Sequence, residues 1–523
     1  MRPTSGWLRA ACRLPAAYVN RIRRGHYPGR SPDLILVPKS PNYSGSFTLT
    51  SHSGPFPYLQ RVPLVFYGPG QVMNTGSIAL DREVTVAGIA PTLAELLGVR
   101  WPKDRAGGVI EEVLAESRDP EKLRLIVVVV WDGGGWNVLN RWPRAWPTLR
   151  RLMREGASIR GVTVGSSPSV TPAVHATIGS GAFPARHGIV DIPLRHNGRM
   201  IGSFRARSPR HMEVTTLADL YDRSTRNEAL VGMYAEHSWH LGMLGHGGFL
   251  RRGDKDLAVF VGSDGRVRTN RRFYRLPRYI SRESKNPNPA IRAIDAIDGE
   301  IDSLWRGHPL TTDPRDMKST PVSIPLQARL VESLLSREGF GRDRVPDLFF
   351  TNYKQIDFIG HVWNMVNPEV KDALRQSDAA LARLVRFLNG RVGRGAWALA
   401  LTADHGQQPA PLNVGAWPYN VKDLANDVAV EFGEAAEQLV LEHRPTGLWF
   451  DRKVLARSGA TLSEIADFVL KRTAEDDVTS QAADMPPSYL SRLNARIFEA
   501  AFPSKRLPVV ARCTGARLIE EGS

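Results

Sequence analysis

Short runs of apolar residues recur along the chain, and several stop abruptly at a polar or charged residue. The runs lie at 32–38, 62–70, 123–135, 346–353 and 397–406. The clearest one, LRLIVVVVWDGGG, passes from β-branched residues straight to Asp132 and glycines. Apolar runs without alternation are typical of strands that are buried on both faces, as in parallel sheets covered by helices. The pattern therefore predicts a mostly parallel central sheet.

Helical patterns separate these runs. Residues 85–99 (TVAGIAPTLAELLGV) and 376–390 (QSDAALARLVRFLNG) place apolar residues at helical spacing, and Gly390 marks a stop for the second helix. Strands that alternate with helices predict an α/β fold with helices on both faces of the sheet.

Two regions depart from this pattern. Residues 193–345 have weak periodicity and many Arg, His, Gly and Ser residues, which favours a cap or insertion that includes part of the core. Residues 412–500 favour a small α+β module, with a strand at 447–455 and a helix at 461–472 capped by Thr461 or Ser463. The other predicted divisions are an N-terminal segment (1–30), core segments (31–102, 123–192 and 346–411), a charged linker (103–122) and a C-terminal tail (501–523).

Composition and charge add a few constraints. The 523 residues carry a net charge of +16, spread along the chain without a basic tail, which we interpret as a field that attracts anions rather than as a nucleic-acid motif. The longest apolar run is too short to cross a bilayer, and the first residues lack the apolar region of a secretory signal, so a cytoplasmic location is expected. Cys12 and Cys513 are too few for a disulfide framework.

Aspartate and histidine residues follow four of the predicted strands, where ligands of open α/β sheets bind. Each one alone has an ordinary explanation, such as a helix cap or a surface pair. Together they suit two divalent ions with mixed nitrogen and oxygen ligands, with zinc as the first choice and manganese or iron as alternatives. Two such ions can clamp a phosphoryl group for in-line displacement. The residues are Asp132, Asp357, His361, Asp404, His405 and His52.

Thr171 is a candidate nucleophile. Pro172 follows it, which is typical of a helix start, where backbone N–H groups and the helix dipole attract anions. A threonine hydroxyl is a poor nucleophile unless a metal lowers its pKa. A plain helix cap is the alternative interpretation.

The ordered set of motifs resembles the alkaline phosphatase superfamily, in particular its nucleotide pyrophosphatase/phosphodiesterase branch. The matching pieces are VVWDGGG, SVTPAVHATIGSGAFPARHGI, DFIGH, TADHG and SHSGPFPYLQRVPLVFYGPG. The resemblance implies that Thr171 attacks phosphorus and forms a phospho-threonine that water later hydrolyses. It also implies two ion sites, the first made by Asp357, His361 and His52 and the second by Asp132, Asp404, His405 and the Thr171 oxygen.

The order of the motifs departs from the family. There, the segment with the last metal histidine follows the DHG motif, whereas here it comes first, within residues 31–102. The chain is therefore expected to be circularly permuted, with the new join near 103–122. This requires His52 to lie within reach of Asp357 and His361.

The phosphate pocket also departs from the family. An asparagine that commonly contacts the phosphoryl group is replaced by Ile192, which cannot donate a hydrogen bond. Arg195, Asn197 or an arginine of the 193–345 region are candidates to replace it. Lys354 and Asn364, which flank a metal motif, are further candidate substrate contacts.

The remaining histidines fall into two groups. His175 and His187 lie inside the nucleophile motif, where packing or support of the ligands is expected. The others are expected on the solvated surface, with a substrate contact left open; they are His237, His240, His246 and His308.

These observations predict a two-metal phosphohydrolase that cleaves phosphodiester or nucleotide pyrophosphate bonds in a small phosphate-ester or nucleotide substrate. A phosphomonoesterase is the second choice, because no Lys-x-Arg element that would bind the extra phosphate charge lies near the motifs. A non-catalytic anion- or nucleic-acid-binding relative is a third. The sequence leaves the oligomeric state open.

Overall fold

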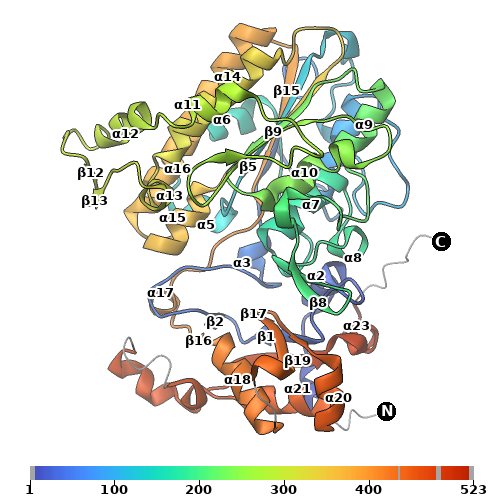
Figure 1. Ribbon diagram of the computed structural model, residues 1–523, viewed down its shortest axis with the longest axis vertical. Helices are drawn as coiled ribbons and strands as arrows, with labels where there is room; N and C mark the ends of the chain where they lie inside the picture. Colours follow the sequence, from blue (N-terminus) through green and yellow to red (C-terminus); the bar gives the residue numbers. More distant parts are fainter. Residues whose placement is uncertain (1–5, 434–435, 479–484, 517–523) are drawn as a thin grey trace.

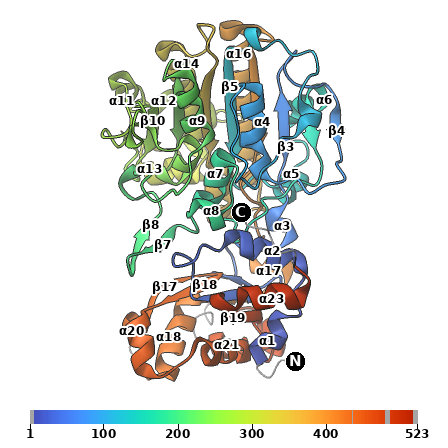
Figure 2. The ribbon, with the colours of Figure 1, turned by 90° about the vertical axis from the view of Figure 1, so that its right-hand side faces the viewer.

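A computed structural model describes residues 6–433, 436–478 and 485–516 of the chain. The predicted segments 1–30, 412–500 and 501–523 therefore lie partly outside the described residues. Figures 1 and 2 show two parts along the long axis of the molecule, a larger one above and a smaller one below. Each part is built on its own β-sheet.

A mostly parallel sheet forms the centre of the larger part. β5 pairs in parallel with β14 and β15, whereas β3 is antiparallel to β15. This confirms the predicted α/β fold class. In order across the sheet, the strands are β11 (Val267–Arg268), β10 (Leu257–Val261), β9 (Val231–Ala235), β14 (Asp347–Tyr353), β5 (Leu125–Trp131), β15 (Trp397–Thr402), β3 (Leu64–Tyr67), β6 (Ala157–Ile159) and β4 (Gly76–Ile78).

Helices cover both faces of this sheet, so β5 is buried along its whole length. Ile126, Val128 and Val130 pack in one apolar core, and Val127 and Val129 pack in the other. Burial on both faces explains the unbroken apolar run in the sequence. The first core is lined by α4 (Ile89–Leu96), α7 (Thr171–Ser180), α9 (Leu217–Thr225) and α10 (Leu241–Leu244), and the second by α6 (Pro147–Glu155), α14 (Ser323–Glu338), α15 (Gln355–Trp363) and α16 (Pro368–Leu388).

The smaller part is built on an antiparallel sheet, and β1 belongs to it. The sequence placed the run at 32–38 in the central parallel sheet, and this is wrong: β1 pairs with β18 and β19. All of β1 is buried, so its apolar run looks like that of a central parallel strand. The strands in order are β17 (Val440–Arg444), β18 (Gly447–Phe450), β1 (Leu34–Pro38) and β19 (Phe498–Pro503).

Helices pack against this smaller sheet around a third apolar core. Thr461 caps α21 in a capping box with Glu464, as one of the two predicted caps. The predicted strand at 447–455 ends early, at Phe450, because Asp451 caps a helix there. The helices are α1 (Gly6–Ala11), α2 (Ala16–Gly25), α18 (Val421–Glu431), α20 (Arg452–Ser458), α21 (Leu462–Lys471) and α23 (Leu507–Thr514).

The region at 193–345 contributes strands as well as surface elements. β9 and β10 lie within it and extend the central sheet beyond β14. Their apolar runs are only five residues long each, which left them unassigned in the sequence. The rest of the region includes the hairpin β7 (Pro193–His196) and β8 (Arg199–Gly202), and the helices α11 (Arg278–Glu283), α12 (Asn288–Asp295) and α13 (Pro314–Ser319).

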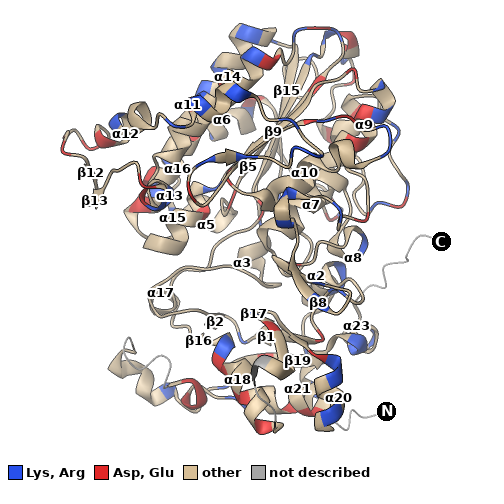
Figure 3. Cartoon of the chain, in the orientation of Figure 1, with Lys and Arg blue, Asp and Glu red and all other residues tan. Residues whose placement is uncertain are grey.

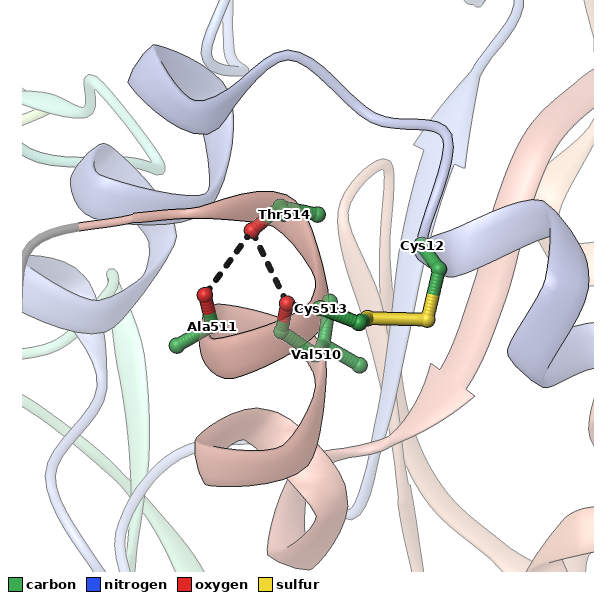
Figure 4. The surroundings of a disulfide bond; sticks show 5 residues. All are labelled: Cys12, Val510, Ala511, Cys513 and Thr514. Atoms are coloured by element: carbon green, nitrogen blue, oxygen red, sulfur yellow. Dashed lines mark hydrogen bonds between the residues drawn. A yellow bond between two sulfur atoms is a disulfide. The ribbon is translucent and has the colours of Figure 1, made fainter. Parts of the chain in front are cut away.

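A disulfide joins the two ends of the chain in the smaller part. Cys12, just after α1, is bonded to Cys513 of α23 across a separation of 501 positions (Figure 4). The sequence excluded a framework of several disulfides but did not pair these two residues.

The charge of the surface and the apolar character of the helices are relevant to binding of anions and of membranes. Lysine and arginine residues are spread over both parts of the molecule (Figure 3), as the sequence indicated. Within the described residues, no helix combines the length and the apolar character needed to cross a membrane.

The carboxyl ends of the central strands face the smaller part. α5 (Trp136–Arg141), which follows β5, lies at the edge of the larger part nearest the smaller sheet in both views (Figures 1 and 2). α3 (Pro57–Gln60) lies along the same edge, next to the connections between the two parts.

Candidate metal centre

Three neighbouring parallel strands bring three aspartates to one edge of the sheet. Asp132 directly follows β5, Asp357 lies in the first turn of the helix after β14, and Asp404 lies just beyond β15. Because β5 pairs with both β14 and β15, their carboxyl ends are adjacent. The rule that located these residues in the sequence therefore also places them together in space.

The first predicted set of ligands gathers around Asp357. His361 Nε2 lies 3.3 Å from Asp357 Oδ1, and His52 Nε2 lies 3.6 Å from the same oxygen. His52 belongs to a loop more than 300 positions earlier in the chain, yet it has the position that the permuted order requires. The geometry meets the requirement set by the sequence.

The second predicted set gathers around His405. Its Nε2 lies 3.5 Å from Asp132 Oδ1 and 3.4 Å from Asp404 Oδ2. It also lies 3.9 Å from Asp357 Oδ1, and its ring stacks on that of His52 with 3.5 Å between centroids. The two sets therefore form one continuous centre.

The three histidines share one orientation. Each holds its Nδ1 near a backbone carbonyl, so that Nδ1–H donates and the Nε2 lone pair faces the carboxylates. This is the arrangement in which proteins present imidazole to a metal ion. The pairs are His52 with Ser169 O at 3.1 Å, His361 with Thr50 O at 2.9 Å and His405 with Gly406 O at 3.0 Å.

Several buried atoms of the centre have no hydrogen-bond partner among the described residues. They are Asp357 Oδ1, Asp404 Oδ2 and His405 Nε2. Buried polar atoms are costly unless they are satisfied. A set of oxygen and imidazole nitrogen atoms that lacks hydrogen bonds and points to a common centre fits divalent cations such as zinc.

Thr171 lies beside this centre. It is the first residue of α7, with Pro172 next to it, as predicted, and it is buried. Its Oγ1 accepts a hydrogen bond from Lys354 Nζ at 3.0 Å. The same ammonium lies 2.8 Å from Asp132 Oδ1 and 2.7 Å from Asp357 Oδ2. A lysine that the sequence gave only as a flanking candidate thus lies in the middle of the centre.

Two side chains hold the far oxygen of Asp132. His240 Nε2 and Asn352 Nδ2 each lie 3.2 Å from Asp132 Oδ2, which leaves Oδ1 to face the centre. His240 is fully buried, so its expected surface position is wrong. The available signal was the short run VGMYA of β9, because His240 follows the carboxyl end of that strand.

The charges of the centre shift the pKa values of its members. Burial raises the pKa of Asp404 to about 7, helped by the nearby charge of Asp132. Burial alone would raise the pKa of Asp357, but Lys354 and His361 lower it well below its ordinary value. Burial alone would lower the pKa of His405, but Asp404 and the other carboxylates raise it to about 9. These opposite shifts follow from carboxylates, imidazoles and the ammonium of Lys354 buried within a few ångströms of one another.

The predicted substrate contacts Arg195 and Asn197 have other surroundings. Arg195 donates two hydrogen bonds to Asp33, at 2.9 and 2.6 Å, and a third to Phe450 O at 2.9 Å, so its guanidinium is committed to the smaller part. Asn197 lies in the exposed turn between β7 and β8. The structure therefore gives no support for either residue as a substrate contact. Arg195 is hydrogen-bonded to Asp33, a contact that no local pattern in the sequence indicates, and Asn197 is exposed.

The other singled-out residues contact protein groups. His187 Nε2 lies 3.1 Å from Thr177 Oγ1, which agrees with a packing role. Asn364 accepts a hydrogen bond from Thr50 Oγ1 at 3.0 Å, close to the carbonyl that His361 contacts. Ile192 is half-buried ahead of β7 and offers no side-chain donor.

Comparisons with known proteins agree with this picture. The chain is 23% identical over 403 residues to alkaline phosphatase PafA of Elizabethkingia meningoseptica, covering 66% of this chain and 72% of the relative. It is 24% identical over 379 residues to a protein named calcium-transporting ATPase of Myroides odoratus, covering 61% and 68%. The crystal structure of wild-type PafA superposes with a TM-score of 0.55 at 19% identity, covering 72% of this chain and 84% of that one, which shows a shared fold.

A sequence model of one family extends over most of the chain. It is described as type I phosphodiesterase / nucleotide pyrophosphatase and matches residues 126–484, from β5 onward. The matched region holds Asp132, Thr171, Asp357 and Asp404, whereas His52 lies ahead of it. The protein therefore belongs to the type I phosphodiesterase / nucleotide pyrophosphatase family and is a phosphohydrolase.

Proposed function

We propose that this phosphohydrolase cleaves phosphodiester or nucleotide pyrophosphate bonds with two divalent ions and a phospho-threonine intermediate on Thr171. The observation that carries the proposal is the position of Thr171 Oγ1. It lies at the N-terminus of α7, beside the cluster of carboxylates and imidazoles. A small phosphate-ester or nucleotide substrate is the expected partner.

Two groups of residues would hold the ions, which we propose to be zinc, with manganese or iron as alternatives. When bound, the ions neutralise charge on the phosphoryl group and lower the pKa of the threonine hydroxyl. One group is Asp357, His361 and His52, and the other is Asp132, Asp404, His405 and the Thr171 oxygen.

The side chains of the protein then carry out the displacement. Thr171 gives its hydroxyl proton to solvent water and Oγ1 forms a bond to phosphorus. The bond between phosphorus and the leaving oxygen breaks, and the leaving oxygen takes up a proton from water. Water later attacks the phospho-threonine and releases phosphate or a phosphate monoester. The N-terminus of α7 favours the negative charge that approaches Thr171.

A phosphomonoesterase is the second candidate, and a specific observation favours it. The sequence placed it second for lack of an extra cation near the motifs, but the ammonium of Lys354 lies within 3.0 Å of Thr171 Oγ1. A cation at that point suits the additional charge of a monoester. Two of the curated relatives are also named alkaline phosphatases.

We further propose that the chain is circularly permuted relative to its family. Supporting this, β3 and α4 precede β5 in the chain but complete the same sheet and core. The family match begins only at residue 126. His52, ahead of that match, lies against Asp357.

Hydrolysis of a bis-aryl phosphate and of a mono-aryl phosphate after metal loading tests the reaction and its substrate class. Thr171→Ala is expected to lower kcat by at least about 10³-fold on the preferred substrate. Chelation is expected to abolish turnover. Hydrolysis that survives both treatments would contradict the mechanism, whereas a preference for the mono-aryl ester would select the second candidate.

A further inference from the structure

We propose that Lys354 is a further catalytic residue, whose ammonium donates a hydrogen bond to a non-bridging oxygen of the phosphoryl group during attack by Thr171. This inference rests on the proposed function, because it assumes that Thr171 is the nucleophile. The contacts of Lys354 with the proposed nucleophile and with the carboxylates are the basis for this role.

The ammonium of Lys354 is held from three directions. Nζ donates hydrogen bonds to Asp132 Oδ1 at 2.8 Å and to Thr171 Oγ1 at 3.0 Å, and it forms an ion pair with Asp357 Oδ2 at 2.7 Å. The side chain is 2% exposed, so water does not compete for these contacts. The position of Nζ is therefore defined by the nucleophile and by one carboxylate from each proposed ion site.

The two oxygens of the Asp357 carboxylate have different neighbours. Oδ2 contacts Lys354, whereas Oδ1 faces His52 and His361 and has no hydrogen-bond partner in the part of the chain that the structure describes. Asp357 can thus bind a cation through Oδ1 and still hold Lys354 through Oδ2. Lys354 does not need to leave when that site is filled.

The contact with Thr171 places Lys354 next to the reacting atoms. In a reactive complex the attacking oxygen lies about 3 to 3.5 Å from phosphorus. The non-bridging oxygens of that group are then within reach of an ammonium that is 3.0 Å from the same attacking oxygen. Lys354 would then exchange one of its three present acceptors for a phosphoryl oxygen. The ammonium would stabilise the negative charge on that oxygen.

The opposing interpretation is that Lys354 is only a counter-ion for the buried carboxylates. A counter-ion would affect folding and metal content but not the affinity for a phosphate-like anion. The two roles therefore separate in binding measurements, which do not depend on turnover.

The test compares Lys354→Met and Lys354→Gln with Lys255→Met, a matched control at an exposed lysine that contacts Arg271 O. Orthovanadate binding is measured by calorimetry on metal-loaded protein, metal content by elemental analysis, and kcat and KM on the preferred aryl phosphate. The Gln variant keeps a polar side chain of similar shape, so that failure of the Met variant to fold still leaves a comparison.

We expect both Lys354 variants to keep their metal and to bind vanadate at least about 10-fold more weakly. We expect kcat to fall by about 10²- to 10³-fold. The control is expected to match the wild type. Wild-type vanadate affinity in a folded Lys354 variant, or weakened binding that tracks lost metal, would overturn the proposal. A wild-type protein without hydrolysis or vanadate binding would instead refute the proposed function.

Discussion

At the scale of single residues, the centre is defined by which atom of each side chain is already engaged. His52, His361 and His405 each use Nδ1 on a backbone carbonyl, and this leaves Nε2 for a ligand. A sequence shows that a histidine is present but not which of its nitrogens is free. The orientation is what turns a loop histidine into a metal ligand candidate.

Removal of one such histidine is expected to remove one ion. His52→Ala should lower the bound metal by about one ion per chain, because the first set keeps only two ligands where three are usual. Elemental analysis of purified protein measures this directly. His308→Ala is the control, since His308 pairs with Glu369 and stacks on Trp363 rather than on a proposed ligand. Unchanged metal content in His52→Ala would refute the ligand role of His52.

The buried pair of His246 and Asp219 predicts that the stability of the protein depends on pH. Both ring nitrogens of His246 meet acceptors, Asp219 Oδ2 at 2.7 Å and Met212 O at 3.1 Å, which suits an imidazolium. Burial alone would lower the pKa of His246, but Asp219 raises it above 6.5. The stabilisation by the charged histidine is therefore complete below its ordinary pKa and is lost as the pH rises through the raised value.

The measurement is thermal or urea unfolding of the wild type and of His246→Gln at pH 6 and pH 9. The substitution should cost about 1 to 3 kcal/mol at pH 6 and clearly less at pH 9. An equal cost at both pH values would contradict titration of the imidazole between them.

The metal ligand positions could be proposed from the sequence because one rule covers them. Polar residues that directly follow parallel strands meet at one edge, and Asp132, Asp357 and Asp404 obey this rule. The substrate contacts could not be found in the same way. Arg195 pairs with Asp33, 162 positions away, and no spacing in the sequence reports such a contact.

At the scale of elements, the ion pair between Arg195 and Asp33 connects the β7–β8 hairpin to the smaller sheet. Arg195→Met should destabilise the protein by about 3 to 5 kcal/mol, because it removes two hydrogen bonds from the buried carboxylate of Asp33 and leaves it only the N–H of Phe450 and the exposed Arg452 among the described residues. KM for the aryl phosphate should not change. Chemical denaturation and steady-state kinetics measure the two effects.

Arg452→Met is the matched control for that prediction. Arg452 contacts the same Asp33 at 3.4 Å, but its side chain is 59% exposed, so a cost below about 1 kcal/mol is expected. A raised KM with unchanged stability in Arg195→Met would restore the original prediction of a substrate contact.

The strands show what an apolar pattern can and cannot determine. The run of β5 predicted a central strand correctly, since burial on both faces produces it. The run of β1 has the same character in an antiparallel sheet, because helices and strands of the smaller part also bury both of its faces. A pattern reports burial, and the choice of sheet depends on contacts across the whole chain.

At the scale of the whole molecule, the disulfide between Cys12 and Cys513 links two residues that are 501 positions apart in the chain. The double substitution Cys12→Ser, Cys513→Ser should lower the free energy of unfolding by about 2 to 5 kcal/mol. Urea unfolding with and without reductant measures this, and reductant should have no effect on the variant. Two free thiols in the non-reduced wild type would contradict the bond.

The same bond bears on location. Disulfides persist in oxidising compartments and are rare in the cytoplasm. The cytoplasmic location stays a prediction, and the state of these two thiols in protein from its native host bears on it.

The proposed circular permutation also belongs to this scale. The first 125 residues supply β1 to the smaller sheet, β3, β4 and α4 to the larger part, and His52 to the centre. The order of motifs in the sequence indicated such a rearrangement, whereas the division between the two sheets appeared only in the structure. The candidate metal centre thus combines His52 of this first segment with residues from the rest of the chain.

The central claim is that Thr171 becomes covalently phosphorylated. The most direct measurement is acid quenching of metal-loaded protein during turnover of an aryl phosphate, followed by mass spectrometry of the peptide that contains Thr171. The account predicts a phosphate on Thr171 in the wild type and none in Thr171→Ala or in chelated protein. Rapid turnover with Thr171 unmodified at every quench time, and with activity retained by Thr171→Ala, would contradict it.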